Sequence, residues 1–442
     1  MSYHFRPYEQ EQMYLMPPSV QDWVREDSLA RFVSEVVDEL ATKGRLAGFY
    51  APYREDGWGA AAYHPVMMVK VLLYAYSTGL ASSRKIAAAL EQDVGYRFLA
   101  ANQTPDHRTV NTFRSQHREA LESLFVEILE LCGEAGLVKL GRVALDGTRV
   151  QGNSAIERKQ TRAQLEAAVQ EMLVAAEAVD RAEDEQYGMD VRGDELPEEL
   201  RSAKKRLQKL KAALAKLDED RDKLREAQQK LVDEREKRGG IKRGRKPKDP
   251  GEIELPEKTT VNTTDPESQI LSTRRGWVQG YNAQAMTDCG SQVIVAQQIT
   301  QDHNDVKQLA PMLERCLEQA GAVPDTLVAD SRYWSDANSR AGGEATLLLI
   351  AVPRRPGKAV SPPSEQRQAM EQRLQEEKNQ GAYAQRKSTI EPVFGQMRTR
   401  GLRSFGLRGK AKAALEWSLW CTTHNLLKLW RARMRPVWLA TG

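Results

Sequence analysis

Two aspartates and a glutamate stand at positions from which their carboxylates could share one site. Asp146 and Asp330 each follow a short apolar run, Val-Ala-Leu and Leu-Val-Ala, that is typical of a buried strand. Glu391, in RKSTIEPVFGQMRTRG, lies beside the apolar face of a helix. Carboxylate oxygens are the ligands that Mg²⁺ prefers, and two such ions can activate a nucleophile and stabilise the leaving oxygen at a phosphodiester. We therefore take Asp146, Asp330 and Glu391 as candidate catalytic acids and candidate ligands of two Mg²⁺ ions, which Mn²⁺ could replace.

Each acid also has a simpler interpretation. An aspartate after a strand is often a turn residue or a helix cap, and a glutamate before proline often lies in the first turn of a helix. Asp265 and Asp288 are rival acids that resemble turn residues, and in the group Asp302, His303 and Asp305 the last is expected to cap a helix. The order Asp, Asp, Glu on strand, strand and helix favours the catalytic interpretation of the three candidates.

The elements that must position these acids follow from hydrophobic periodicity. A strand is expected over Leu140–Val150, ending near Asp146, and a long charged insert then interrupts the sheet. The later chain predicts strands at 269–274, 281–286 and 292–299, a helix at 306–319, a strand at 325–330, a short helix at 335–341, a strand at 347–352, and helices at 366–400 and 410–433. This α/β order resembles that of a ribonuclease-H-like domain.

The insert, residues 159–250, is rich in Ala, Glu, Lys, Arg and Leu and is broken by Gly and Pro near 187–197. We predict an antiparallel helical hairpin that touches DNA or a second subunit, and an independent dimerisation coil is the alternative. A basic linker, GGIKRGRKPKDPG, follows at 239–251. Two coiled-coil heptad positions of the second helix are occupied by Leu200, Leu207 and Leu214, and by Ala203, Leu210, Leu217, Leu224 and Leu231.

The N-terminal part, residues 22–136, has the three- and four-residue apolar spacing of helices. Ser82 or Ser83 is expected to cap SSRKIAAALEQD, and Thr104 or Asp106 to cap TPDHRTVNTFRSQHREAL. Together these segments resemble a helix-turn-helix DNA reader. The candidate DNA contacts in the second segment are Arg108 and Arg114.

Basic residues gather on both sides of Glu391. One interpretation is a rim that grips DNA phosphates, with an affinity that falls as salt rises, and the alternative is a solvated helix face. Trp334, close to Asp330, could stack on a base flipped out during cleavage or simply belong to the core. The candidate DNA contacts of this region are Trp334, Arg386, Lys387, Arg398, Arg400 and Arg403.

Composition limits the class of protein. The 442 residues exceed what one core normally holds, so two or three domains are expected. No apolar run approaches the roughly 20 residues of a membrane span, and Met1–Gln12 lacks an apolar signal core. Four cysteines lie far apart without a CxxC pair, which argues against a disulfide framework and a zinc ribbon and fits a reducing cytoplasm. The net charge of +4 hides local basic patches, and no nucleotide-binding loop occurs, so no nucleotide cofactor is expected.

Five separated motifs resemble bacterial insertion-sequence transposases of the DDE class, in the subgroup with a helical insert after the first Asp: LDGT, VNTTDPESQI, GWVQGYNAQAMTD, LVADSRYWS and RKSTIEPVFGQMR. HPVMMVKVLLYAYSTGLASSRKIAAAL and TPDHRTVNTFR are similar to the N-terminal domain of the same transposases. The resemblance covers nearly the whole chain and implies that Asp146, Asp330 and Glu391 are the catalytic acids. It also implies that a homodimer binds double-stranded DNA, at terminal inverted repeats and target, and performs metal-dependent cleavage and strand transfer.

The resemblance suggests four segments. A helical DNA-binding domain is expected at 1–136, and the first part of a ribonuclease-H-like catalytic domain at 137–158. The helical insert and basic linker occupy 159–250. The remainder of the catalytic domain and the C-terminal helices follow at 251–442.

Two positions depart from the family pattern. The family usually has Gly before the Tyr of the second acidic block, where this chain has Arg332, so strain at the metal site is expected. Around the last acid, Tyr383 and Arg386 precede Glu391 with one residue too many, and Arg398 stands where Lys is usual. Arg332 leaves open a catalytically silent DNA-binding protein derived from a transposase. A nuclease that hydrolyses DNA without joining it is a third alternative.

Overall fold

The computed structural model describes residues 19–53, 61–187, 198–237, 247–273, 276–353 and 364–440. Within these ranges, the side chains of 176–187, 198–204 and 435–440 are not described. The N-terminal segment 1–12, the break at 188–197 and most of the basic linker lie outside the described residues.

A group of helices precedes the sheet, as the apolar spacing predicts. Asp106 accepts the backbone N–H of Thr109 at 2.7 Å, which confirms it as the cap of its helix. Ser82 holds the N-cap position of the helix that begins at Ser83, without a side-chain hydrogen bond. The helices are α1 (Val20–Trp23), α2 (Leu29–Thr42), α3 (Pro65–Ser77), α4 (Ser83–Gln92), α5 (Val94–Leu99), α6 (His107–Gln116) and α7 (Arg118–Glu134).

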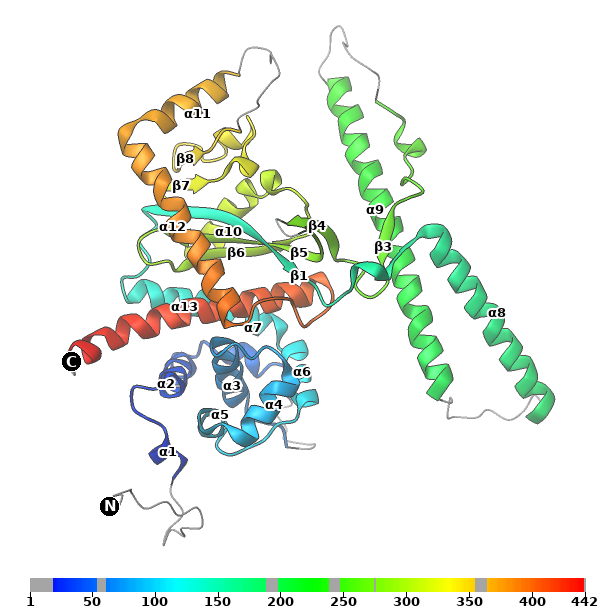
Figure 1. The fold of residues 1–442 in the computed structure, drawn as a ribbon, viewed down its shortest axis with the longest axis horizontal. Coiled ribbons are helices and arrows are strands. Elements are labelled where there is room, and N and C mark those ends of the chain that lie inside the picture. Colours follow the sequence, from blue (N-terminus) through cyan, green and yellow to red (C-terminus); the bar gives the residue numbers. More distant parts are fainter. Residues whose placement is uncertain are drawn as a thin grey trace, which may run out of the picture.

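A mixed sheet forms the centre of the molecule, with the strand order β4-β5-β1-β7-β8 and with β6 also beside β5 (Figure 1). β1 pairs antiparallel with β5 and parallel with β7, and β7 pairs parallel with β8. The strand predictions are therefore confirmed in kind and order. The strands are β1 (Arg142–Gln151), β4 (Gln269–Thr273), β5 (Gly276–Asp288), β6 (Ile294–Thr300), β7 (Thr326–Ala329) and β8 (Leu347–Ile350).

The prediction that the first strand ends near Asp146 is wrong. β1 continues to Gln151 because its pairing with β5 runs unbroken to Gln151 opposite Gly280. Its parallel pairing with β7 stops at Leu145 opposite Ala329. Asp146 thus stands where one partner strand ends while the other continues.

The insert leaves the sheet after β1 as a short strand and two long helices, which project away from the rest of the molecule (Figure 1). Leu165, Leu210 and Leu217 are buried between the helices, together with Val261. Leu224 and Leu231, expected in the same apolar seam, are 47% and 55% exposed, so the seam is short. The elements are β2 (Lys159–Thr161), α8 (Arg162–Tyr187), α9 (Glu198–Lys237) and β3 (Thr260–Asn262), and β2 pairs with β3.

The remaining helices are α10 (Leu309–Ala320), α11 (Glu365–Gln375), α12 (Glu377–Arg400) and α13 (Lys410–Ala440). The helix predicted at 366–400 is divided at Glu376, and the short helix predicted at 335–341 is only a 3-10 turn at Asn338–Arg340. No helix in the described ranges is long and apolar enough to cross a bilayer.

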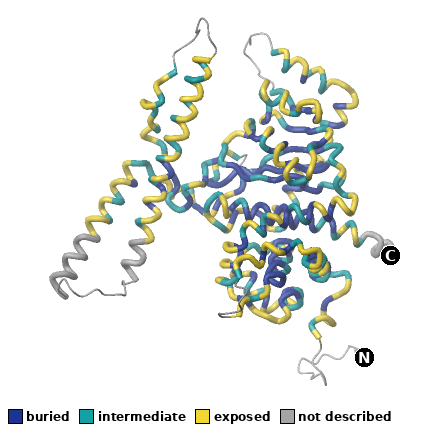
Figure 2. The backbone as a smooth tube through the Cα atoms, turned by 180° about the vertical axis from the view of Figure 1, so that it is seen from behind, coloured by how far each residue is buried: buried dark blue, intermediate teal, exposed yellow. Residues whose placement is uncertain are grey.

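α13 joins the N-terminal helices to the sheet, because it lies between them (Figure 1). Trp417 and Trp420 on α13 are fully buried, and the ring of Trp420 packs edge-on against Tyr76 of α3 at a centroid distance of 5.5 Å. The buried band runs without interruption from the sheet through α13 into the N-terminal helices (Figure 2). The N-terminal helices therefore share one core with the α/β part.

Candidate active site

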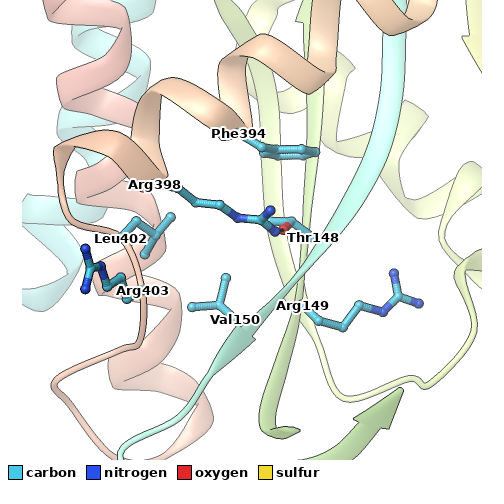
Figure 3. Close-up of a pocket in the computed structure, with 7 residues that line it drawn as sticks. All are labelled: Thr148, Arg149, Val150, Phe394, Arg398, Leu402 and Arg403. Atoms are coloured by element: carbon cyan, nitrogen blue, oxygen red, sulfur yellow. Dashed lines mark hydrogen bonds between the residues drawn. The ribbon is translucent and has the colours of Figure 1, made fainter. Parts of the chain in front are cut away.

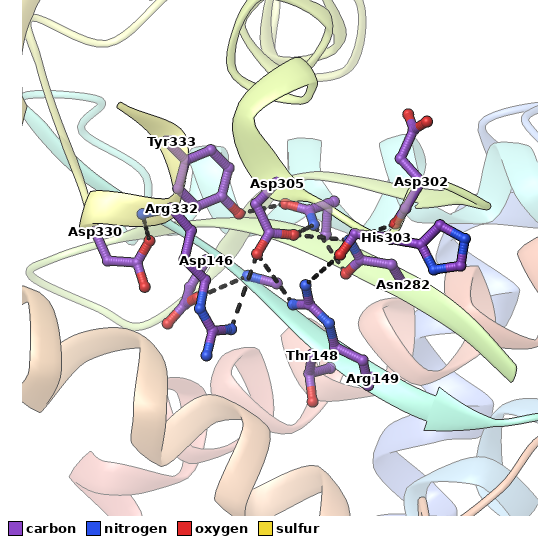
Figure 4. A network of polar contacts seen from close by, with 12 residues as sticks. Asp146, Thr148, Arg149, Asn282, Asp302, His303, Asp305, Asp330, Arg332 and Tyr333 are labelled. Carbon is purple, nitrogen blue, oxygen red and sulfur yellow. Dashed lines mark hydrogen bonds and ion pairs between the residues drawn. The ribbon is translucent and has the colours of Figure 1, made fainter. Parts of the chain in front are cut away.

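Asp146 and Asp330 are neighbours across the boundary between β1 and β7. Leu145 and Ala329 are register partners in this parallel pair, and each aspartate is the next residue of its chain segment. The apolar runs before them are buried on both sides of the sheet, which fixes where the two strands lie. Figure 4 shows the two carboxylates side by side at this point.

The environment of Asp146 opposes its negative charge. Burial raises the pKa of Asp146 to about 6, and the nearby charge of Asp330 adds to the rise. The backbone N–H of Gly147 donates to Oδ1 at 2.8 Å, and Nη1 of Arg386 donates to Oδ2 at 3.2 Å, and both contacts favour the ionised form. The charge of Asp330 disfavours the ionised form of Asp146, and a divalent cation bound between the two carboxylates would cancel that repulsion, so the pair is a donor set that suits such a cation.

Asp330 begins a tight turn directly after β7. Its Oδ1 accepts the backbone N–H of Arg332 at 2.9 Å, so Asp330 caps the 3-10 helix Ser331–Tyr333. Arg332 is not among the residues with positive φ, so its backbone has a conformation that any L-residue adopts. The expected strain from the missing glycine is therefore absent at Arg332.

Glu391 lies in the interior of α12, fourteen residues after its first residue, so the simpler interpretation as a first-turn acid is wrong. α12 crosses β1, with Arg386 bonded to Asp146 and Nη2 of Arg398 donating to Oγ1 of Thr148 at 2.6 Å. Glu391 lies between these anchors, which are about 18 Å apart along the helix axis. Its side chain is exposed, and no group of three acidic, His or Cys side chains that could hold a metal occurs in the described ranges. The structure thus brings together two of the three candidate acids and places the third on the helix that crosses them.

A buried polar network lies beside the two aspartates, and the sequence analysis does not predict it. Asp305 is 1% exposed and was expected to be a cap, but its Oδ1 accepts hydrogen bonds from Asn282 at 2.7 Å and Gln284 at 2.9 Å. Its Oδ2 pairs with Nη1 of Arg149 at 3.0 Å, and Tyr333 donates to Gln284 (Figure 4). The cap prediction is wrong because Asn304 takes the N-cap position. The sequence did offer one signal for this network, because polar residues occupy alternate positions of a strand that is otherwise apolar. Buried polar groups must be paired, so such residues indicate partners nearby.

A small pocket lies next to the aspartates, between β1 and the end of α12 (Figure 3). Its lining includes Thr148, Arg149, Arg398 and Arg403. Thr148 is two residues after Asp146 on β1, so the pocket continues from the acid pair along the strand. The Arg398 guanidinium, which is directed at Thr148, gives this wall a charge that suits an anion, whereas the guanidinium groups of Arg149 and Arg403 point away from the other lining residues (Figure 3).

The other predicted DNA contacts fall into different environments. Arg114 is 3% exposed and donates to the Tyr76 hydroxyl at 3.1 Å and the Ala81 carbonyl at 2.9 Å, so its assignment as a DNA contact is corrected to a structural role. Trp334 is half-buried and packs against the core, which favours the simpler interpretation. Arg108, Lys387 and Arg403 are exposed, and Arg386 and Arg400 are largely buried.

Two family models match the chain. Residues 18–116 match the model described as Transposase domain (DUF772), and residues 358–430 match the model described as Transposase DDE domain. The chain is a relative of the DDE transposases of insertion sequences. None of the curated proteins and none of the solved structures that were compared matches it. The DDE match covers α12 and most of α13 and includes Glu391, Arg386 and Arg398.

The transposase matches agree with the geometry described above. The first match covers α1 to α6, the helices with the expected DNA reader, and a transposase family suggests DNA as the partner. The second implies a ribonuclease-H-like fold and the use of divalent metal ions, and a mixed α/β sheet with an acid pair at its centre fits both. Asp146 and Asp330 lie outside both matches, so their place in the site depends on the strand register alone.

Proposed function

We propose that the chain is the transposase of an insertion sequence, which binds the terminal inverted repeats of its element and catalyses metal-dependent DNA cleavage and strand transfer. The observation that carries the proposal is the placement of Asp146 and Asp330 at adjacent positions of two parallel strands, under the helix that bears the DDE match. A homodimer is proposed because two element ends must be cut and joined together.

Asp146, Asp330 and Glu391 are proposed to hold two Mg²⁺ ions, which when bound supply an activated nucleophile and neutralise charge at the scissile phosphate. Arg386 holds the carboxylate of Asp146 in the ionised form that a metal requires. Asp305 and its amide partners fix β5 against β1 and keep Asp146 in place. The Arg398 guanidinium, oriented by Thr148, provides a contact for a DNA phosphate next to the acids.

The test is cleavage and joining of duplex DNA that carries the ends of the element, with Mg²⁺ or Mn²⁺. Asp146→Asn, Asp330→Asn and Glu391→Gln are each expected to lose cleavage and keep DNA binding. Asp325→Asn is a matched control, because Asp325 is exposed at the opposite end of β7. Glu377→Gln at the start of α12 is the control for Glu391→Gln. Both controls are expected to cut DNA at the wild-type rate.

The outcomes separate the alternatives. Full activity of the Glu391→Gln variant would mean that Glu391 is not a catalytic residue. If only the two aspartate variants lost activity, the assignment of Asp146 and Asp330 would stand. Binding without nicking, with either metal, would make the chain a catalytically silent derivative of a transposase. Cut products that are never joined would make it a hydrolytic nuclease.

A further inference from the structure

The cations of the basic segment that ends α12 are divided between two faces of the helix. Arg398 contacts β1 and lines the small pocket beside the acids. Arg400, two residues later and therefore roughly 200° around the helix, turns toward α13. A second and larger pocket of about 420 Å³ lies on that side, between the two helices. It is lined by Gly395, Gln396, Thr399 and Arg400 of α12 and by His424, Leu427, Lys428 and Arg431 of α13.

The second pocket gathers positive charge without an acid in its lining. Arg400, Lys428 and Arg431 form no ion pair in the parts of the chain that the structure describes. Among the residues that the structure describes, Lys428 donates to the amide oxygen Oε1 of Gln292, at 2.8 Å. Burial, together with the nearby charge of Arg431, lowers the pKa of Lys428 to about 8. Burial likewise lowers the pKa of His424, to about 3, so that ring is neutral and the charge comes from the three longer side chains.

Arg400 supplies charge from inside the pocket wall. Its Nη1 and Nη2 atoms are buried without a hydrogen-bond partner, and its Cζ atom lies 5.6 Å from the centre of the Trp420 ring. A buried guanidinium without a carboxylate is unfavourable, because neither water nor a counterion compensates its charge. The positive charge of Arg431 also repels the guanidinium of Arg400. An anion bound between Arg400, Lys428 and Arg431 would compensate the buried charge and reduce this repulsion.

We infer that the pocket between α12 and α13 is a binding site for a phosphate of the DNA backbone, separate from the catalytic site. Thr399 and Gln396 provide neutral polar side chains in the same wall, and Lys428 and Arg431 provide the cations nearest to solvent. The inference rests on the proposed function, because DNA is the polyanion that such an enzyme must hold. With Arg398 on one face and Arg400 on the other, α12 would lie between two phosphate contacts.

The test measures the affinity of the full-length chain for a fluorescent DNA duplex by anisotropy, over a series of salt concentrations. Arg431→Gln and the double variant Lys428→Gln with Arg431→Gln are compared with the wild type. The double variant is expected to bind several-fold more weakly, and the slope of log Kd against log salt is expected to fall by about one for each lost phosphate contact. Arg433→Gln is the matched control, because it removes the same charge two residues away, where Arg433 pairs with Glu39 at 3.4 Å. That control is expected to keep the wild-type slope.

Unchanged affinity and slope in the double variant would overturn the inference. If inorganic phosphate raised the melting temperature of the wild type but not of the double variant while DNA affinity stayed equal, the pocket would be a site for free phosphate and not for DNA. Arg431 is exposed, so its single variant tests the same slope even if the double variant folds poorly. Cleavage activity is measured separately. A wild type that binds DNA through this pocket but never cuts it would refute the proposed function and leave this site standing.

Discussion

The guanidinium of Arg386 donates a hydrogen bond from Nη1 to Oδ2 of Asp146 at 3.2 Å. Both side chains are nearly buried, with exposed fractions of 8% and 15%. The contact joins α12, which carries the DDE match, to the strand that carries the first acid. It also sets the charge state of that acid, because a cation next to a carboxylate favours the ionised form.

Replacing Arg386 by Gln should move the pH dependence of the reaction. The cation lowers the pKa of Asp146, so its removal lets burial and Asp330 raise that pKa above about 6. Because a protonated carboxyl is a poor metal ligand, Mg²⁺-dependent cleavage should fall off at a higher pH, by about one unit. A pH profile of the cleavage rate measures this shift. Lys378→Gln, an exposed change near the start of α12, should leave the profile in place. An identical profile for the Arg386 variant would show that the contact does not act on Asp146.

Replacing Asp146 by Asn should stabilise the fold at neutral pH in metal-free buffer. The pKa of Asp146 is about 6 in the folded chain against 3.8 in the unfolded chain, so between these values the folded state binds more protons. The free energy of unfolding therefore falls as pH rises from about 4 to about 6 and stays low above it. Asn carries no charge and avoids this loss, which is on the order of 1 to 3 kcal/mol.

Urea denaturation of the Asp146→Asn variant and the wild type at pH 7.5 and pH 4.5 measures the effect. The variant should gain stability over the wild type at the higher pH, and the gain should shrink at the lower pH. Saturating Mg²⁺ should reverse the order at pH 7.5 if Mg²⁺ binds as proposed, because the variant lacks one of the three proposed carboxylate ligands. Equal stability at both pH values would mean that Asp146 ionises normally.

The sequence was sufficient for the features that depend on local patterning. Apolar runs with β-branched residues located the strands, and the side chain of Asp106 marked a helix start that the structure confirms. The sequence also allowed Asp146 and Asp330 to be neighbours, because each follows a short apolar run and the ends of two central strands can lie side by side, and the pairing of β1 with β7 shows that they do. These predictions depend on the period of side-chain burial, which a single strand or helix displays on its own.

The features that could not be predicted from the sequence depend on which helices and strands contact one another in the fold. The role of Arg114 changed because α3 and the turn before α4 supply its acceptors, and nothing in its own helix indicates them. Leu224 and Leu231 keep the heptad spacing beyond the point where α8 still covers α9, so spacing predicted a longer seam than contact allows. Arg398 and Arg400 looked equivalent in one basic run, but the helix turns them to different pockets.

Replacing Gly147 by Ala should disrupt the buried network around Asp305. A Cβ atom at this position would lie 2.4 Å from Nε2 of Gln284 and 2.9 Å from Oδ1 of Asn282, the amide partners of Asp305. Displacing them leaves a buried carboxylate with fewer donors, so the variant should lose about 2 to 4 kcal/mol of stability. Urea denaturation measures this loss.

Asp305→Ala tests the same network from its centre. It should cost about 3 to 5 kcal/mol, because it leaves the nearly buried Arg149 guanidinium without its carboxylate. Gly133→Ala is the control, since nothing lies within 4 Å of a Cβ there and the residue is in a helix. Losses below 1 kcal/mol in both network variants would show that the network does not hold β1 and β5 together.

Replacing Gly79 by Ala should weaken the connection between the N-terminal helices and α12. Gly79 has φ +87°, and a Cβ atom there would lie 1.8 Å from the carbonyl oxygen of Arg400. Backbone cannot yield as a flexible side chain does, so the turn after α3 must move away from the end of α12. The strain of the left-handed conformation and the collision together should cost about 3 kcal/mol or more.

Gly44→Ala separates the two contributions to this loss. Gly44 has a similar φ of +73°, but nothing lies within 4 Å of its Cβ position. It should therefore show the conformational strain alone, about 1 to 2 kcal/mol. Because α13 packs against both α3 and the sheet, the Gly79 variant should also expose Trp420, which a red shift of tryptophan fluorescence would report. Equal losses for the two glycine variants would mean that the turn moves without disturbing α12, and that the N-terminal helices do not depend on this contact.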